Sequence, residues 1–212
     1  MRDVLGKTVR IARLEGEVPR HTFREIEVLH RAQLVAGALA HMPDGFLASF
    51  YRYLVTRADC VVLIAEKEGR LAGFAAGALH ASSLLKSFVL SEPLQMAGYC
   101  TRLLLDPRLL YRILSLALNL ATNIQHSNMD ERQLLSIAVD PRVGRSGVGT
   151  ELFNALCDWF RSSGAEDFGI IAAKTQTAAL QFYNRCGAVK VGEMRLGGLD
   201  SIRFHYALPP AV

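Results

Sequence analysis

The stretch SIAVDPRVGRSGVGTELFNALCDWF, residues 136–160, places three glycines within six residues between an apolar run and an amphipathic one. The apolar run from Gln133 to Val139 is typical of a β-strand covered on both faces, and it stops at Asp140-Pro141. From Gly149 to Ser163 the apolar residues fall on one helical stripe, namely Leu152, Leu156, Trp159 and Phe160. The chain is therefore predicted to pass from a buried strand through a glycine loop directly into a helix.

The loop itself has the spacing G-x-x-G-x-G at Gly144, Gly147 and Gly149. The first backbone N–H groups of a helix have no intrahelical partner and lie at its positive end, so they can bind an anion. Glycine helps because a Cβ would keep phosphate oxygens away from these N–H groups. Arg142 and Arg145 could add charge at the mouth of the loop. On spacing alone, a plain strand-to-helix turn is an equal alternative.

Two better-known phosphate loops do not fit this stretch. No Lys-Ser/Thr pair follows the glycines as a P-loop requires, and the order G-x-G-x-x-G of a dinucleotide-binding loop is absent. The loop therefore needs a second feature before it can be assigned.

The first part of the chain predicts β-α-α-β-β followed by a helical insertion. The expected elements are a strand over Thr8–Leu14, helices over Thr22–Ala40 and 46–56, a β-hairpin turning at Lys67–Arg70, and helical residues 81–130. Thr22 and Glu25 have the spacing of a capping box, which predicts that the first helix begins at Thr22.

The last part of the chain predicts β-α-β-α-β-β. After the strand and helix of the glycine loop, a buried strand is expected over Phe168–Ala173, then a helix from Thr175 or Thr177 to Cys186. Two further strands, near Val189–Arg195 and Ser201–Leu208, would pair across Gly197-Gly198.

Composition favours a single domain over residues 1–212. Half of the residues are hydrophobic and 21% are charged, without a break along the chain. The net charge of +4 comes from scattered basic residues, which argues against a nucleic-acid partner. The four cysteines and six histidines show no metal-ligand spacing, so no metal is expected. Free cysteines and the lack of a signal-peptide pattern favour a cytoplasmic protein.

Two stretches together resemble the GNAT superfamily of N-acetyltransferases. The family signature is a strand ending in V-x-P, a loop R/Q-x-x-G-x-G/A that opens a helix, and then N-x-x-A-x-x-x-Y-x-x-x-G-F. The matching residues are Val139, Pro141, Gly147, Gly149, Ala179, Tyr183 and Gly187. The departures are Gly144 at the family's Arg or Gln, Gln176 at its Asn, and Ala188 at its last aromatic. The resemblance is good over residues 133–208 and loose before them.

This resemblance implies a fold and a cofactor. The fold is α/β, a GNAT-like mixed, mostly antiparallel central sheet flanked by helices, with the 81–130 insertion before the fourth strand. The cofactor is acetyl-coenzyme A as acyl donor, lying where the fourth and fifth strands splay apart. The implied cofactor-binding residues are Ile137, Ala138, Val139, Arg142, Gly144, Arg145, Ser146, Gly147, Val148, Gly149, Thr150, Gln176 and Ala179.

The resemblance also implies the chemistry of amine acetylation. Tyr183 is the expected catalytic acid, because a phenol of pKa ~10 can donate to a thiolate whose thiol titrates near ~8.5; from helix periodicity alone, Tyr183 is a packed aromatic. A backbone N–H near Val139 is the expected oxyanion donor. No base is named: Gln133 stands where some relatives have Glu, and Glu66, His126, Asp130 and Glu131 suit the surface.

The acceptor expected from the resemblance is a small amine. Residues 42–54 resemble GNAT proteins of surface-glycan synthesis, which would imply an amino sugar. An acyl donor longer than acetyl and a non-catalytic acyl-CoA sensor are alternatives. The apolar stretch 103–124 is broken by Asp106, Pro107, Arg108 and Arg112, and its uncharged remainder, residues 113–124, is too short to span a membrane. The stretch could cover the site, form a homodimer contact or touch a membrane surface.

Overall fold

A single sheet forms the centre of the molecule in the computed structural model, which describes residues 9–35, 38–93, 96, 98–99, 131–143, 146–196 and 199–209. Within these residues seven strands have the order β1-β2-β3-β4-β5-β7-β6. Neighbouring strands are antiparallel except β4 and β5, which are parallel. This confirms the predicted mixed, mostly antiparallel sheet. The strands are β1 (Arg10–Arg13), β2 (Cys60–Lys67), β3 (Arg70–Ala78), β4 (Gln133–Val139), β5 (Asp167–Ala173), β6 (Val189–Leu196) and β7 (Leu199–Ala207).

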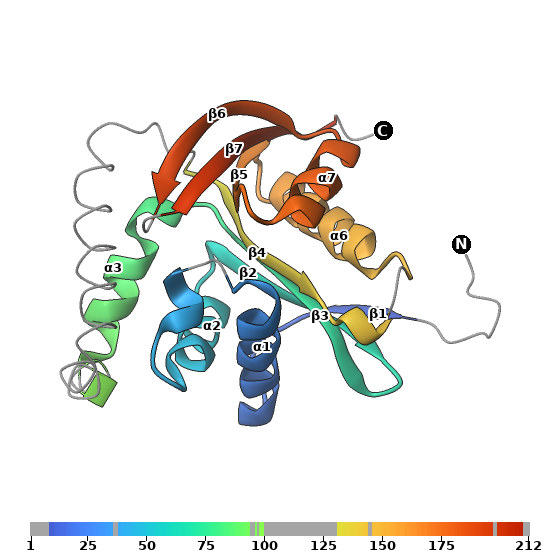
Figure 1. Cartoon of the computed structure of the whole chain (residues 1–212). Coiled ribbons are helices and arrows are strands. Elements are labelled where there is room, and N and C mark those ends of the chain that lie inside the picture. The colour runs from blue at the N-terminus through green and yellow to red at the C-terminus, as the bar shows by residue number, and fades with distance from the viewer. Residues whose placement is uncertain are drawn as a thin grey trace.

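Helices cover both faces of the sheet. Helices α1 and α2 lie on one side of the strands, and α6 and α7 lie on the other (Figure 1). Two buried apolar clusters result, one formed mainly with α1 and α2 and one with α6. The described helices are α1 (Arg20–Gln33), α2 (Phe46–Val55), α3 (Ala81–Ser91), α6 (Val148–Ser162) and α7 (Thr177–Arg185), with short 3₁₀ turns η1 (Ala38–His41) and η2 (Pro141–Val143).

Helix α6 packs unusually close to β3. The apolar stripe predicted for α6 is confirmed, because Leu152, Leu156, Trp159 and Phe160 are all buried. A Cβ at Gly77 would lie 2.8 Å from Leu156 Cδ1 and 3.1 Å from Phe160 Cζ. Glycine near the end of β3 therefore lets the helix that begins at the glycine loop sit directly on the sheet.

The predicted bounds of the first helix were wrong at both ends. The helix begins at Arg20 after Pro19, with no side-chain capping hydrogen bond, so Thr22 lies inside the first turn and the capping box does not form. It ends at Gln33. Near this end the Arg31 guanidinium binds a later segment by donating to the carbonyl oxygens of Ala40, Met42 and Pro43.

Other elements match their predictions closely. The β2–β3 hairpin turns at Glu68-Gly69, β4 has its predicted bounds, and β6 pairs with β7 across residues 197–198. Helix α3 confirms the first part of the helical insertion, whereas residues 100–130, including the apolar stretch 103–124, lie outside the described residues. Among the described helices, none combines the length and apolarity needed to cross a membrane.

Candidate active site

The parallel strands β4 and β5 separate after two residue pairs. They pair only at Gln133 with Gly169 and at Leu134 with Ile170. On its other side β4 keeps pairing with β3 as far as Val139, and β5 keeps pairing with β7 as far as Ala173. We call the diverging residues, 135–139 of β4 and 171–173 of β5, the β4–β5 fork. Its inner backbone groups have no ladder partner among the described residues, so an extended ligand could pair there as an added strand would.

Helix α6 begins beside the end of β4. Gly147 is its N-cap residue with φ +82°, a left-handed conformation that favours glycine, and no side chain caps the helix within the described part of the chain. The N–H of Thr150 donates to Gly147 O, whereas the N–H groups of Val148 and Gly149 have no acceptor among the described residues. A Cβ placed on Gly149 would lie 3.6 Å from Val139 Cγ2, so the helix start adjoins the fork.

Ser146 brings an unpaired hydroxyl to this helix start. Its Oγ is buried and has no hydrogen-bond partner among the described residues. A buried hydroxyl without a partner is costly, and native structures usually satisfy such a group with water or a ligand. An oxygen-rich anion at the N-terminus of α6 would satisfy it.

Arg142 does not face the loop freely. Its guanidinium binds the Asp140 carboxylate through Nε–Oδ1 and Nε–Oδ2 distances of 3.0 Å. The Arg142 backbone N–H also donates to Asp140 Oδ1 at 2.9 Å. Hydrogen bonding to Arg142 lowers the pKa of Asp140, so the pair is ionised. The positive charge expected at the mouth of the loop from Arg142 is therefore largely offset by Asp140, and Gly144 and Arg145 lie outside the described residues.

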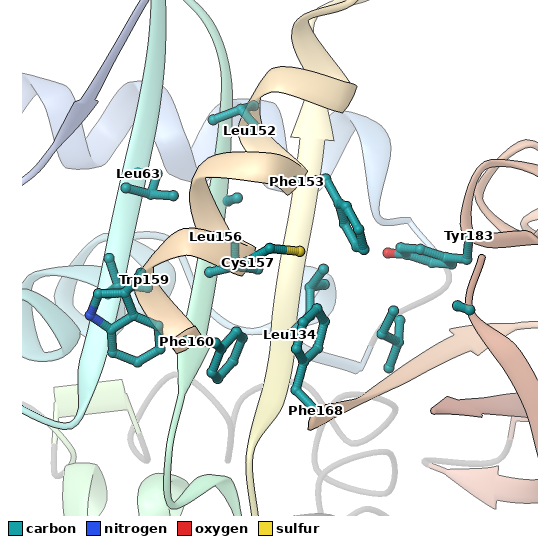
Figure 2. Close-up of a cluster of buried hydrophobic side chains, with 14 of the residues drawn as sticks. Leu63, Leu134, Leu152, Phe153, Leu156, Cys157, Trp159, Phe160, Phe168 and Tyr183 are labelled. Atoms are coloured by element: carbon teal, nitrogen blue, oxygen red, sulfur yellow. The ribbon is translucent and has the colours of Figure 1, made fainter. Parts of the chain in front are cut away.

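Tyr183 lies on α7 at the opposite side of the fork from α6. The side chain is 4% exposed and packs against Phe182 and Phe204. Figure 2 shows its oxygen directed toward Phe153 and β4. Among the described residues its hydroxyl has no hydrogen-bond partner. Burial raises the pKa of Tyr183, so the phenol stays protonated throughout the neutral range.

The fold and site agree with a family match. Residues 120–188 match the family model described as acetyltransferase (GNAT) family. The matched residues are about a third of the chain and include β4, α6, β5 and α7. A search of curated proteins found no sequence match.

Several solved structures share the fold of this chain at low sequence identity. The N-acetyltransferase of Staphylococcus aureus Mu50 has a TM-score of 0.60 at 11% identity, over 95% of this chain and 99% of that one. The yncA protein of Salmonella typhimurium with its cofactor acetyl-CoA has a TM-score of 0.59 at 14% identity, over 97% of this chain and 96% of that one. Arabidopsis thaliana NAA60 in complex with acetyl-CoA has a TM-score of 0.57 at 14% identity, over 95% of this chain and 99% of that one.

The other predicted site residues fall into two groups. Ile137, Val139 and Ala179 pack against the α6 cluster, whereas Ala138 is buried on the α1–α2 face. Gln176 occupies the N-cap position of α7 but makes no capping hydrogen bond. In the described part of the chain, no group of three or more His, Cys, Asp or Glu side chains could hold a metal ion.

A buried polar chain behind β4 escaped the sequence analysis. His30 Nδ1 lies 2.7 Å from the Tyr51 hydroxyl, which lies 2.8 Å from Ser136 Oγ on β4. Burial, reinforced by the neighbouring charge of Arg31, lowers the pKa of His30 to about 4, so the imidazole is neutral. The one signal in the sequence is Ser136, a hydroxyl within an otherwise apolar strand. These two hydrogen bonds connect α1 and α2 to β4, the strand that forms one side of the fork.

Proposed function

We propose that this protein transfers an acetyl group from acetyl-CoA to the primary amine of a small molecule. The observation that carries the proposal is the β4–β5 fork, with an uncapped helix start at one end and the Tyr183 hydroxyl directed toward it. The acetyl-CoA complexes of the Salmonella and Arabidopsis proteins, which share the fold, support the choice of donor.

The residues at the start of α6 fit the pyrophosphate of the donor. The N–H groups of Val148 and Gly149 and the unpaired hydroxyl of Ser146 supply donors where the helix dipole is positive. The backbone of Ile137–Val139 supplies strand-like hydrogen bonds for the pantetheine arm. In this proposal Gly147 provides the turn, and Arg142 mainly neutralises Asp140.

The proposed chemistry needs a neutral amine and an acid for the leaving group. The amine nitrogen attacks the thioester carbonyl, and a backbone N–H near Val139 stabilises the oxyanion. When the C–S bond breaks, the sulfur carries the electron pair and takes a proton from the Tyr183 hydroxyl. The raised pKa keeps the phenol protonated at neutral pH, and the phenolate left after the transfer regains a proton from water, which takes up the proton of the amine.

No side chain is proposed as the base. Glu131 is exposed, with its Oε2 3.7 Å from His80 Nδ1, and Gln133 cannot usefully accept a proton. We propose instead that the amine loses its proton through water.

The class of acceptor is proposed from a sequence resemblance alone. We propose an amino sugar as the first acceptor to screen, on the resemblance of residues 42–54 to GNAT proteins of surface-glycan synthesis. Cys60, Cys157 and Cys186 are free thiols, which favours a reducing compartment such as the cytoplasm for the reaction.

A Tyr183→Phe variant tests the proposed function. We expect kcat to fall by about 100-fold, because the leaving thiolate loses its acid, while the Kd for acetyl-CoA stays within about threefold. Steady-state kinetics with an amine acceptor and calorimetric titration measure the two quantities. Tyr206→Phe is the control, because Tyr206 packs in the same apolar cluster on β7.

Unchanged turnover in Tyr183→Phe would remove Tyr183 from the mechanism. Donor binding without turnover of any amine by the wild type would favour the alternative of a non-catalytic acyl-CoA sensor. The altered residues Gly144 and Gln176 are what keep that alternative open.

A further inference from the structure

Three arginines surround a hollow on the side of the sheet that α1 and α2 cover. The hollow has a volume of about 310 Å³. Arg20 and Arg24 reach it from adjacent turns of α1, and Arg52 reaches it from α2. Figure 1 shows these two helices side by side. No acidic side chain is among the described residues that line it.

Two hydroxyl groups and an aromatic ring complete the lining. Ser49 Oγ and the Tyr99 hydroxyl lie 3.3 Å apart, and either can donate a hydrogen bond. Phe23, which is 4% exposed, forms an apolar wall. The hollow thus combines guanidinium groups, neutral hydrogen-bond donors and one flat apolar surface, which together suit a small anion carrying an organic group.

The charges of the lining are only partly offset. Arg52 lies 3.4 Å from Glu92, and Arg31, just outside this hollow, is bound to Glu27 and three carbonyl oxygens. Arg20 and Arg24 are exposed and make no ion pair with any described residue. Within the described part of the chain, two guanidinium charges are therefore left over. A phosphate monoester, with about two negative charges at pH 7, balances them where a carboxylate would not.

An adjoining hollow provides room for the rest of such a ligand. Its volume is about 760 Å³, and it shares Arg24, Gly45 and Tyr99 with the smaller one. Glu27 and Asp44 line it, so its surface is of mixed charge and suits uncharged or cationic parts of a ligand. Hollows of these sizes are in the range that holds small metabolites.

We propose that the α1–α2 hollows bind a small phosphorylated molecule, with its phosphate monoester between Arg20, Arg24 and Arg52. The binding site is distinct from the β4–β5 fork and from the start of α6. It does not rest on the proposed acetyl transfer, and it adds an anion site that the family match does not supply.

The test is calorimetric titration of the full chain with glucose 6-phosphate and with adenosine 5′-monophosphate, using glucose and adenosine as uncharged counterparts. Saturating coenzyme A is present to occupy the start of α6, and the titrations are repeated without it. The variant is Arg20→Gln with Arg24→Gln, both exposed, so folding is preserved. Arg70→Gln, an exposed arginine at the β2–β3 hairpin that lines neither hollow, is the matched control.

We expect at least one phosphate monoester to bind more tightly than its counterpart, and the double variant to lose about tenfold in affinity. The control should bind as the wild type does. Preference for the sugar or for the nucleotide identifies the organic part. Absence of binding by both phosphates, or equal affinity in the wild type and the double variant, would overturn the proposal. Binding abolished by coenzyme A would also overturn it, because the phosphate would then occupy the α6 site.

Discussion

The hydroxyl of Ser146 gives a direct way to separate folding from ligand binding. It is buried at the start of α6 without a partner among the described residues, so no hydrogen bond to them contributes to the stability of the free protein. In the proposed complex it would donate to a phosphate oxygen, a charge-assisted bond of the stronger kind. Removing this hydroxyl should therefore affect the free protein and the complex in opposite directions.

For Ser146→Ala we predict a free energy of unfolding that is unchanged or raised by up to about 1 kcal/mol, and a Kd for acetyl-CoA about tenfold weaker. Urea unfolding and calorimetry measure the two quantities. The control is Ser163→Ala at the other end of α6, where Oγ donates to Trp159 O. It should lose stability and keep its affinity. A destabilised Ser146→Ala protein that binds normally would show that the hydroxyl has a structural partner instead.

His30 makes a second single-residue prediction, about pH. Its pKa is lowered from 6.5 to about 4, so the folded state favours the neutral ring more than the unfolded state does. The resulting stability is complete above pH 6.5 and is lost as the pH falls toward 4. Each pKa unit corresponds to ~1.4 kcal/mol, so at pH 4.5 the loss is about 2 kcal/mol.

In His30→Gln, which keeps a hydrogen-bonding side chain for Tyr51, this part of the acid sensitivity should disappear. The free energy of unfolding, measured from pH 7 to pH 4.5, should fall by about 2 kcal/mol less than in the wild type. Parallel curves for the two proteins would show that His30 does not titrate between these limits.

Among helices and strands, the contact between α6 and β3 depends on a missing side chain. Gly77 allows Leu156 and Phe160 to reach the backbone of β3. Because α6 carries the proposed donor site at its first turn, this packing also fixes where that turn lies relative to β4. Close packing of this kind tolerates added volume poorly.

Gly77→Ala should therefore lower the free energy of unfolding by about 1–3 kcal/mol. Gly192→Ala is the matched control, because a Cβ there meets no atom within 4 Å and the residue does not have a positive φ. Thermal unfolding of both variants gives the comparison. If the two melt together, α6 can shift away from β3 at little cost.

The sequence patterns predicted elements with strong periodicity and missed those set by longer contacts. β4 and the stripe of α6 were predicted correctly, because a continuous apolar run and a helical period are local signals. The end of α1 was missed, and the contacts that Arg31 makes near it, to carbonyl groups nine to twelve residues further on, are not local signals. The capping box at Thr22 and Glu25 was overridden by Pro19, which starts the helix earlier.

At the scale of the whole molecule, the candidate site also contains some features that local motifs predict and others that depend on contacts between distant residues. The glycine loop and Tyr183 could be found from local motifs. The freedom of the Ser146 hydroxyl and the pairing of Arg142 with Asp140 could not, since they depend on side-chain geometry. The arginine hollow and the His30–Tyr51–Ser136 chain join residues from separate elements, and no spacing along the sequence indicates them.

The arrangement of the molecule places two anion-binding regions on different sides of one sheet. The start of α6 adjoins the fork, and the arginine hollow lies between α1 and α2. If both proposals hold, the donor and a phosphorylated ligand bind without competing. Their independence is measurable, because coenzyme A should leave the affinity of the second ligand for the hollow unchanged.

The most direct test of the account is calorimetric titration of acetyl-CoA into the wild type, Gly147→Ala and Gly147→Glu. Gly147 has φ +82°, so both substitutions strain the turn equally, but only Glu adds a carboxylate where the phosphates should lie. We predict wild-type binding on the order of micromolar, a modest loss in Gly147→Ala, and loss of about 100-fold or more in Gly147→Glu. Absence of binding by the wild type, or equal affinities in the Ala and Glu variants, would contradict the assignment of the α6 start and the β4–β5 fork as the donor site.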